Sequence, residues 1–177
     1  RDNCHPFRHG NSLFMHNGRI GGFDGIRREI EQMIPCAYYG QRHGTTDSEA
    51  FFLLALGHGL IEDPVHGLSA AIAEIETVME RRRIEEPFRM TAAFSDGDRL
   101  VAIRHSSDHQ SPTLYWATGK ELTIQDRSVG MSEGLGVTLV LSEPLDTGDL
   151  TWREVPESHV LTSIGGVVST DRLEHFH

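Results

Sequence analysis

Two short segments carry residues that could bind an amide and polarise it. Asn17 and Gly18 follow a short apolar run, and a side-chain amide beside a backbone N–H without a Cβ is a suitable pair of donors for a developing oxyanion. Asp47 lies later in the chain, at the predicted start of a helix, where its carboxylate could hold a cationic group such as a substrate ammonium. Simpler interpretations stay open, because Asn-Gly is also a common tight turn and Asp often caps a helix.

These residues need a strand, a corner and two helices to position them. Residues 13–16 predict a short strand that ends at Asn17-Gly18. Apolar residues recur at three- and four-residue steps over residues 23–33, which predicts a helix that Pro35 terminates. The next helix is predicted to begin at Thr45 or Thr46 as N-cap and to end at residues 57–59. Because this second helix is apolar on nearly all sides, we expect it to be buried.

The remainder of the chain predicts one more helix and then mostly strands. The third helix begins at Pro64 and ends in three arginines, residues 81–83, which complement the helix dipole or, alternatively, bind an anion. The segment Asp96-Gly97-Asp98 predicts a hairpin. The predicted strands are 90–95, 100–104, 113–117, 137–141, 151–155 and 160–164, with a connection over residues 125–136. This order predicts an α+β fold with a largely antiparallel sheet, in one domain over residues 1–177.

Composition excludes several classes of partner. Acidic residues outnumber basic ones by 26 to 16, and the formal charge of −10 opposes binding to a phosphate backbone. No apolar run approaches the roughly 20 residues of a membrane span, and the first residues lack the apolar stretch of a signal peptide. We therefore predict a cytoplasmic protein that binds neither nucleic acid nor membrane.

Metal and cofactor chemistry find little support in the sequence. The chain has 11 histidines, with His5 and His9, and again His105 and His109, four residues apart. Both pairs fall in segments predicted to be loops, where this spacing does not place two rings on one face, and no HExxH motif occurs. No glycine-rich phosphate loop is present either. We predict no metal and no cofactor.

The usual nucleophile patterns are also missing. No Gly-x-Ser-x-Gly elbow occurs. Cys4 is followed by His5, but adjacent residues of an extended chain point to opposite sides, so we expect Cys4 to be a small buried residue. Two widely spaced cysteines, Cys4 and Cys36, suit neither a zinc motif nor a disulfide framework.

Seven segments together resemble a known family. In chain order they are NCHPF, LFMHNG, GTTDSEAFFLLAL, AFSDGDRLVAIR, PTLY, LVLSEPL and WREVP. They resemble the class II glutamine amidotransferases, and more narrowly the stand-alone bacterial members of the N-terminal-nucleophile hydrolase superfamily. The resemblance runs from about Asn3 to about Gly166. It implies a four-layer αββα sandwich of two antiparallel sheets between helical layers, lacking its first strands.

The resemblance also implies roles for the residues introduced first. Asn17 would give its side-chain amide and Gly18 its backbone N–H to the oxyanion hole, and Asp47 would bind the α-amino group of glutamine. Gly21 and Gly22 would be clearance and turn residues beside the site. The implied substrate is a small molecule, glutamine or a γ-glutamyl compound.

The chain departs from this family at its first residue. Members use an N-terminal cysteine as nucleophile, with its own α-amine as base, whereas residue one is Arg1. We expect the segment with that cysteine, the first strands and a carboxylate-binding arginine to lie upstream of Asn3 or on another chain, and this segment alone to be inactive. A homo-oligomer, a non-catalytic γ-glutamyl-binding module and a structural subunit of a split enzyme remain as alternatives.

Overall fold

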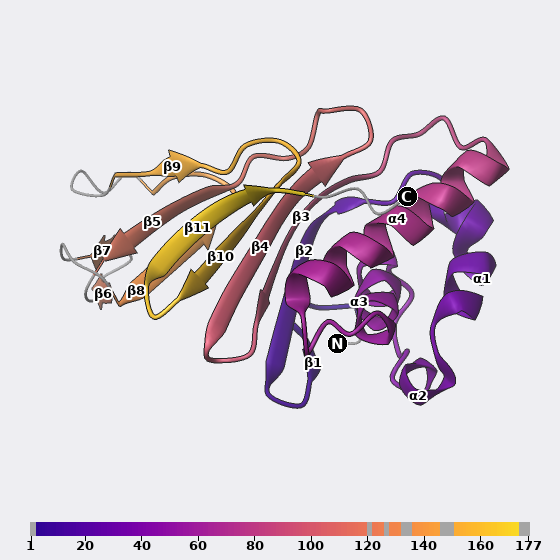
Figure 1. Ribbon diagram of the computed structural model, residues 1–177, viewed down its shortest axis with the longest axis horizontal. Coiled ribbons are helices and arrows are strands. Elements are labelled where there is room, and N and C mark those ends of the chain that lie inside the picture. Colours follow the sequence, from indigo (N-terminus) through magenta and orange to yellow (C-terminus); the bar gives the residue numbers. More distant parts are fainter. Residues whose placement is uncertain (1–2, 120–121, 126–127, 132–135, 146–150, 174–177) are drawn as a thin grey trace.

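Helices cover one face of a six-stranded antiparallel sheet, and a smaller antiparallel sheet lies against the other face (Figure 1). The structure is a computed structural model that describes residues 3–119, 122–125, 128–131, 136–145 and 151–173. The described residues thus supply two sheet layers and one helical layer. The predicted α+β class with two antiparallel sheets is confirmed.

The large sheet has the strand order β1-β2-β3-β4-β10-β11. Its strands are β1 (Phe7–His9), β2 (Ser12–Arg19), β3 (Arg89–Ser95), β4 (Arg99–Ser106), β10 (His159–Ile164) and β11 (Val167–Arg172). The small sheet has the order β8-β5-β9, with β8 (Val137–Leu141), β5 (Tyr115–Gly119) and β9 (Arg153–Glu154). A separate ribbon pairs β6 (Leu122–Gln125) with β7 (Ser128–Met131).

Four helices are described, and three of them were predicted. The helices are α1 (Phe23–Met33), α2 (Cys36–Tyr39), α3 (Asp47–Gly57) and α4 (Pro64–Arg82). Thr46 caps α3, since its side chain accepts a hydrogen bond from the N–H of Glu49. The arginines at the end of α4 contact α1, where Arg81 and Arg82 both pair with Glu29.

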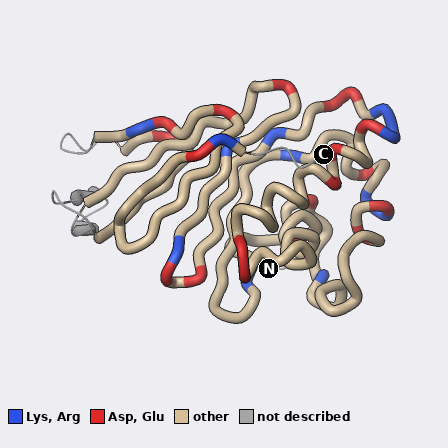
Figure 2. Tube along the Cα trace, viewed as in Figure 1, with Lys and Arg blue, Asp and Glu red and all other residues tan. Residues whose placement is uncertain are grey.

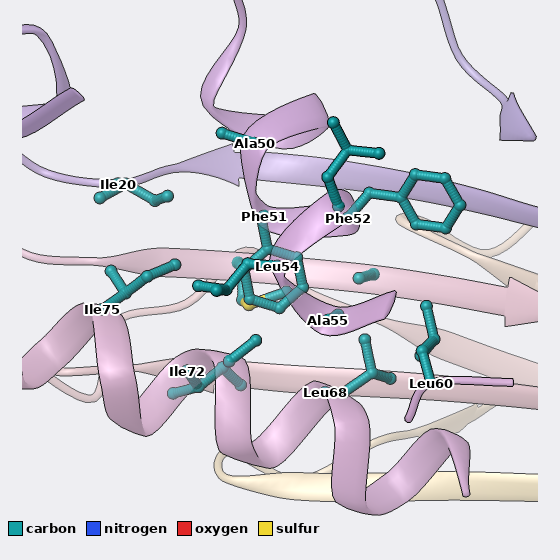
Figure 3. Close-up of a cluster of buried hydrophobic side chains, with 14 of the residues drawn as sticks. Ile20, Ala50, Phe51, Phe52, Leu54, Ala55, Leu60, Leu68, Ile72 and Ile75 are labelled. Carbon is teal, nitrogen blue, oxygen red and sulfur yellow. The ribbon is translucent and has the colours of Figure 1, made fainter. Parts of the chain in front are cut away.

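The main core forms where α3 and α4 pack on the large sheet (Figure 3). Side chains alternate along β2, so that Phe14 and His16 are buried under the helices while Leu13 and Met15 point to the other face and are exposed. Phe14 stacks on Phe51 and Phe52 of α3, with ring centroids 5.8 and 5.2 Å apart. Every residue of α3 from Ser48 to Leu56 is buried, which confirms the prediction of a buried helix.

A second, smaller core holds the two sheets together. Ala102 of β4 and Leu161 of β10 pack from the large sheet against Leu114 and Val155, which lie beside the strands of the small sheet. Arg104 adds a polar link, because its guanidinium donates to the carboxylate of Glu154 at 2.5 Å. The two faces of β4 therefore belong to different cores.

Several sequence predictions need correction. Strand β1 includes His9, and β4 includes His105, in segments predicted to be loops. The short helix α2 follows Pro35, which was predicted only to stop α1. Cys4 is exposed rather than buried. Strands β6, β7 and β11 were also missed. Strand β6 falls outside the predicted strands, and β7 lies in the predicted connection. Strand β11 is an edge strand with mostly exposed side chains, so it lacks the alternation of buried residues on which strand prediction depends.

Charged residues of both signs are interspersed over the face shown in Figure 2, with basic positions scattered among acidic ones. Among the described residues, no helix combines the length and apolar character that crossing a membrane requires.

Candidate functional site

The start of α3 lies against the end of β2. Asp47, the first residue of α3, accepts a hydrogen bond from the backbone N–H of Ile20 at 2.9 Å through Oδ2. Its Oδ1 accepts from the N–H of Ser48 at 2.8 Å. Both carboxylate oxygens therefore accept from backbone donors, one in α3 and one just after the end of β2. The tertiary structure thus brings Asp47 to the strand that carries Asn17 and Gly18.

Asn17 lies on the opposite face of β2 from the helices. Its side chain is exposed and makes no hydrogen bond within the described part of the chain. It lines a pocket of about 210 Å³ between the two sheets. The described residues that line this pocket are His5, Met15, His16, Asn17, Thr91, Ala92, Ala93, Leu114, Val140, Leu141 and Ser142. The donor amide of Asn17 is therefore free to meet a ligand at the edge of a mostly apolar pocket.

Gly18 occupies a position that no other residue fits. Its φ is +147°, and a Cβ there would lie 2.0 Å from the backbone oxygen of Arg89 and 2.7 Å from the Cα of Met90. Gly18 pairs with Met90 of β3, so the close approach is part of the strand pairing. The chain needs glycine here on steric grounds, independently of any chemical role.

The pocket beside Asn17 is not lined by Asp47 or Gly18 in the described part of the chain. His5 lies between this pocket and Asp47, because it lines the pocket and interacts electrostatically with the Asp47 carboxylate. Burial lowers the pKa of His5, and the Asp47 carboxylate acts in the opposite direction. The predicted site residues thus lie on adjacent elements, and their binding of one substrate stays a prediction.

A buried contact between His16 and Ser48 joins the same two elements. The Nδ1 atom of His16 is 2.7 Å from the hydroxyl of Ser48, and both side chains are buried, at 7% relative exposure each. The Nε2 atom of His16 is buried without a hydrogen-bond partner in the described part of the chain. Burial, with a smaller contribution from the nearby His5, lowers the pKa of His16 to about 4 against the opposing charge of Asp47. His16 is therefore neutral at pH 7.

The pKa of His16 predicts that the protein loses stability in mild acid. Between pH 6.5 and pH 4 the unfolded chain takes up a proton at residue 16 that the folded chain does not bind, so the free energy of unfolding decreases as the pH falls. The contribution of this one residue is on the order of 3 kcal/mol, is complete above pH 6.5 and is lost below about pH 4. Chemical denaturation across this range should show a shallower pH dependence in His16→Gln than in the wild type. Equal slopes would contradict the assignment.

The loop before α3 is shaped by a buried ion-pair network. Arg42 donates to Glu49 at 2.5 Å and to Glu31 at 2.9 Å, and the side chains of Arg42 and Glu49 are each only 6% exposed. The carboxylate of Glu49 also accepts from the N–H groups of His43 and Gly44. Glu49 therefore fixes the path of the loop that leads into Asp47.

Gly21 and Gly22 lie where the chain leaves β2 and passes a neighbouring segment. A Cβ on Gly21 would lie 2.0 Å from the backbone oxygen of Glu86, and one on Gly22 would lie 2.9 Å from the side chain of Ile84. Gly22 also has a φ of +62°. These contacts agree with the prediction of clearance and turn residues.

Comparisons with known proteins show which family the chain belongs to. The chain is 37% identical to a glutamine aminotransferase class-II domain protein from Silicibacter pomeroyi, with a TM-score of 0.84 over 99% of this chain and 73% of that one. The chain belongs to the class II glutamine amidotransferase family. It is also 30% identical to the probable glutamine amidotransferase DUG3 of Saccharomyces cerevisiae over 184 residues, which cover 90% of this chain and 52% of that protein. The chain thus spans about half the length of this curated relative.

The fold is shared more widely than the sequence. A predicted glutamine amidotransferase from Pseudomonas aeruginosa superposes with a TM-score of 0.56 at 23% identity, over 94% of this chain and 64% of that one. No protein-family model matches the chain. The predicted resemblance of the chain to the glutamine amidotransferases is confirmed at the level of the family.

Other candidate centres do not carry this family's chemistry. A cavity of about 470 Å³ lies between the end of α4 and the segment 105–109, but its lining includes five carboxylates, which would repel the α-carboxylate of glutamine. They are Glu76, Glu80, Glu85, Glu86 and Asp108. Within the described residues, no group of three or more His, Cys, Asp or Glu side chains could hold a metal ion. Two of the histidines spaced four residues apart in the sequence contact other residues: His9 contacts Gln41, and His105 contacts Glu76.

Sequence reasoning assigned Asn17 and Asp47 but missed His16 and Ser48, which stand next to them in the HNG and TDSE segments. One signal was available. Alternation along β2 places His16 on the face opposite Asn17, where a buried imidazole needs a polar partner from the helical layer. The partner itself could not be found from the sequence, because it depends on how α3 packs on β2.

Proposed function

We propose that the intact protein hydrolyses the γ-amide of glutamine, or of a γ-glutamyl compound, through a cysteinyl thioester. A cysteine thiolate adds to the amide carbon, and the carbonyl oxygen becomes an oxyanion that the Asn17 side-chain amide and the Gly18 N–H stabilise. The C–N bond then breaks, and the nitrogen leaves as ammonia or an amine after taking a proton from the base. Water attacks the thioester, the C–S bond breaks, and glutamate is released. Asp47 binds the α-ammonium group throughout.

One observation carries this proposal. The Asp47 carboxylate accepts a hydrogen bond of 2.9 Å from the N–H of Ile20, the residue just after the end of β2 and two positions beyond Gly18. A carboxylate held at this position can receive an ammonium group while the amide end of a small amino acid lies beside Asn17. Its two backbone donors leave further lone pairs on the carboxylate for that ammonium group.

The nucleophile in this proposal comes from outside the present residues. Cys4 and Cys36 are both exposed, and neither lines the pocket beside Asn17. Leu13 and Met15, on the same face of β2 as Asn17, are 43% and 55% exposed. A segment that brings the cysteine to Asn17 would cover this apolar surface, whether it belongs to the same chain or to another subunit.

Asp47→Asn should weaken glutamine binding in the protein that carries the nucleophilic cysteine. Removing the charge from a group that binds an ammonium costs about 1.5–3 kcal/mol, so KM for glutamine should rise roughly tenfold to a hundredfold. The measurement is glutamate and ammonia release against glutamine concentration. Asp63→Asn is the control, because Asp63 is also an acidic residue at the start of a helix, where it caps α4 and lies away from β2. An unchanged KM in Asp47→Asn, or no hydrolysis by the wild type, would refute the proposal.

A further inference from the structure

A closed set of hydrogen bonds brackets Asn17 and Gly18. His16, just before them, contacts the hydroxyl of Ser48 at 2.7 Å. The N–H of Ser48 donates to Asp47 Oδ1 at 2.8 Å, and Asp47 Oδ2 accepts from the N–H of Ile20 at 2.9 Å. The bonds thus leave β2 at residue 16 and return to the chain at residue 20, just after the end of β2. The first turn of α3 is therefore bound to the chain both before and after the two predicted oxyanion donors.

The surroundings of His16 favour the tautomer with the proton on Nδ1. Nδ1 lies 2.7 Å from the Ser48 hydroxyl, which can accept from an N–H there and donate toward Asp47 Oδ1 at 3.4 Å. Nε2 then carries only a lone pair. Burying this acceptor without a partner costs less free energy than burying an N–H donor without one. In the opposite tautomer an N–H would be buried with no acceptor in the described part of the chain.

Packing makes this connection stiff. The ring of His16 stacks on Phe51 with 6.2 Å between centroids, and Phe51 is fully buried in the main core. Ser48 lies one turn of α3 before Phe51 and is itself buried. Neither partner can therefore move without disturbing the core around β2 and α3.

We propose that Ser48 is a positioning residue of the glutamine site, with His16 as its partner. Ser48 does not contact the substrate. It holds the Asp47 carboxylate in place relative to Asn17 and Gly18, so that one glutamine molecule can bind Asp47 through its ammonium group and the oxyanion donors through its amide. This inference rests on the proposed function. The role of Ser48 is to keep the binding groups correctly placed, because small misplacements of such groups lower the reaction rate by large factors.

Glutamine kinetics of three variants of the protein with its nucleophilic cysteine test this role. Ser48→Ala should raise KM about tenfold, the effect of roughly one lost hydrogen bond, with a smaller effect on kcat. Ser48→Thr keeps a hydroxyl and should restore KM to near the wild-type value. Ser69→Ala is the matched control, because Ser69 is similarly buried, at 6% exposure, but lies on α4. It should leave KM unchanged.

The outcomes separate this inference from the proposed function. If Ser48→Ala behaves like Ser69→Ala while Asp47→Asn raises KM, the positioning role is wrong and the proposed function stands. If neither Ser48→Ala nor Asp47→Asn changes KM, both fall. A measurement on the wild type needs no variant to fold: nitrogen NMR of the His16 ring should report the Nδ1–H tautomer, and an Nε2–H tautomer would overturn the inference.

Discussion

Asn17→Ala is expected to lower the turnover of glutamine by the intact protein about 10²- to 10³-fold, the usual cost of removing one oxyanion donor. The donor is needed only when the carbonyl oxygen becomes charged, so the loss should appear mainly in kcat, with KM less affected. This pattern is the opposite of the one expected for Asp47→Asn. Steady-state kinetics that follow glutamate release would measure both.

The loss in Asn17→Ala should not come from unfolding. The Asn17 side chain is exposed and makes no hydrogen bond within the described residues, so the variant should stay within about 0.5 kcal/mol of wild-type stability. Asn11→Ala is a suitable control, because Asn11 is an exposed asparagine in the turn between β1 and β2. Wild-type turnover in Asn17→Ala would remove the oxyanion role from this residue.

The second large effect is expected in stability, from Glu49→Ala. Removing one partner of a buried ion pair costs about 3–5 kcal/mol, because the remaining charge stays buried. In Glu49→Ala, the guanidinium of Arg42, whose side chain is only 6% exposed, loses one of its two carboxylate partners. The N–H groups of His43 and Gly44 lose their acceptor as well. Because Glu31 still pairs with Arg42, we expect the free energy of unfolding to fall by about 3 kcal/mol. Chemical denaturation measures it as a lower free energy of unfolding.

Glu29→Ala provides the contrast for that measurement. Glu29 also pairs with arginines, Arg81 and Arg82, but both of these are 59% exposed. Breaking an exposed pair costs at most about 1 kcal/mol. If Glu29→Ala and Glu49→Ala lost equal stability, the network around Arg42 would not be the buried anchor of the loop before α3.

Local patterns predicted most of the elements that position the site. The apolar spacing of residues 23–33 matches α1, and Thr46 is the N-cap of α3 as its sequence indicates. The hairpin at Asp96-Gly97-Asp98 joins β3 to β4, with Gly97 at a φ of +98°. Each of these features depends on residues within one or two turns of each other, so the sequence alone is sufficient to predict them.

Elements with few local signals were missed. Strand β1 has three residues and β11 has mostly exposed side chains, so neither shows the alternation of apolar and polar residues that predicts a strand. Their hydrogen bonds to β2 and β10 stabilise them as strands. The burial of Cys4 was wrong for a related reason, because a residue's exposure depends on what the rest of the chain packs over it.

Local sequence is sufficient to predict that Asn17 and Gly18 follow an apolar run, and that Asp47 begins a capped, apolar helix. The tertiary structure alone decided that this helix lies against that strand, with Asp47 bound to Ile20 and His16 bound to Ser48. The reason is physical. Turns, caps and periodicity arise from interactions between neighbours in the chain, whereas contacts between β2 and α3 form only when the large side chains of the core, such as Phe14 and Phe51, pack together.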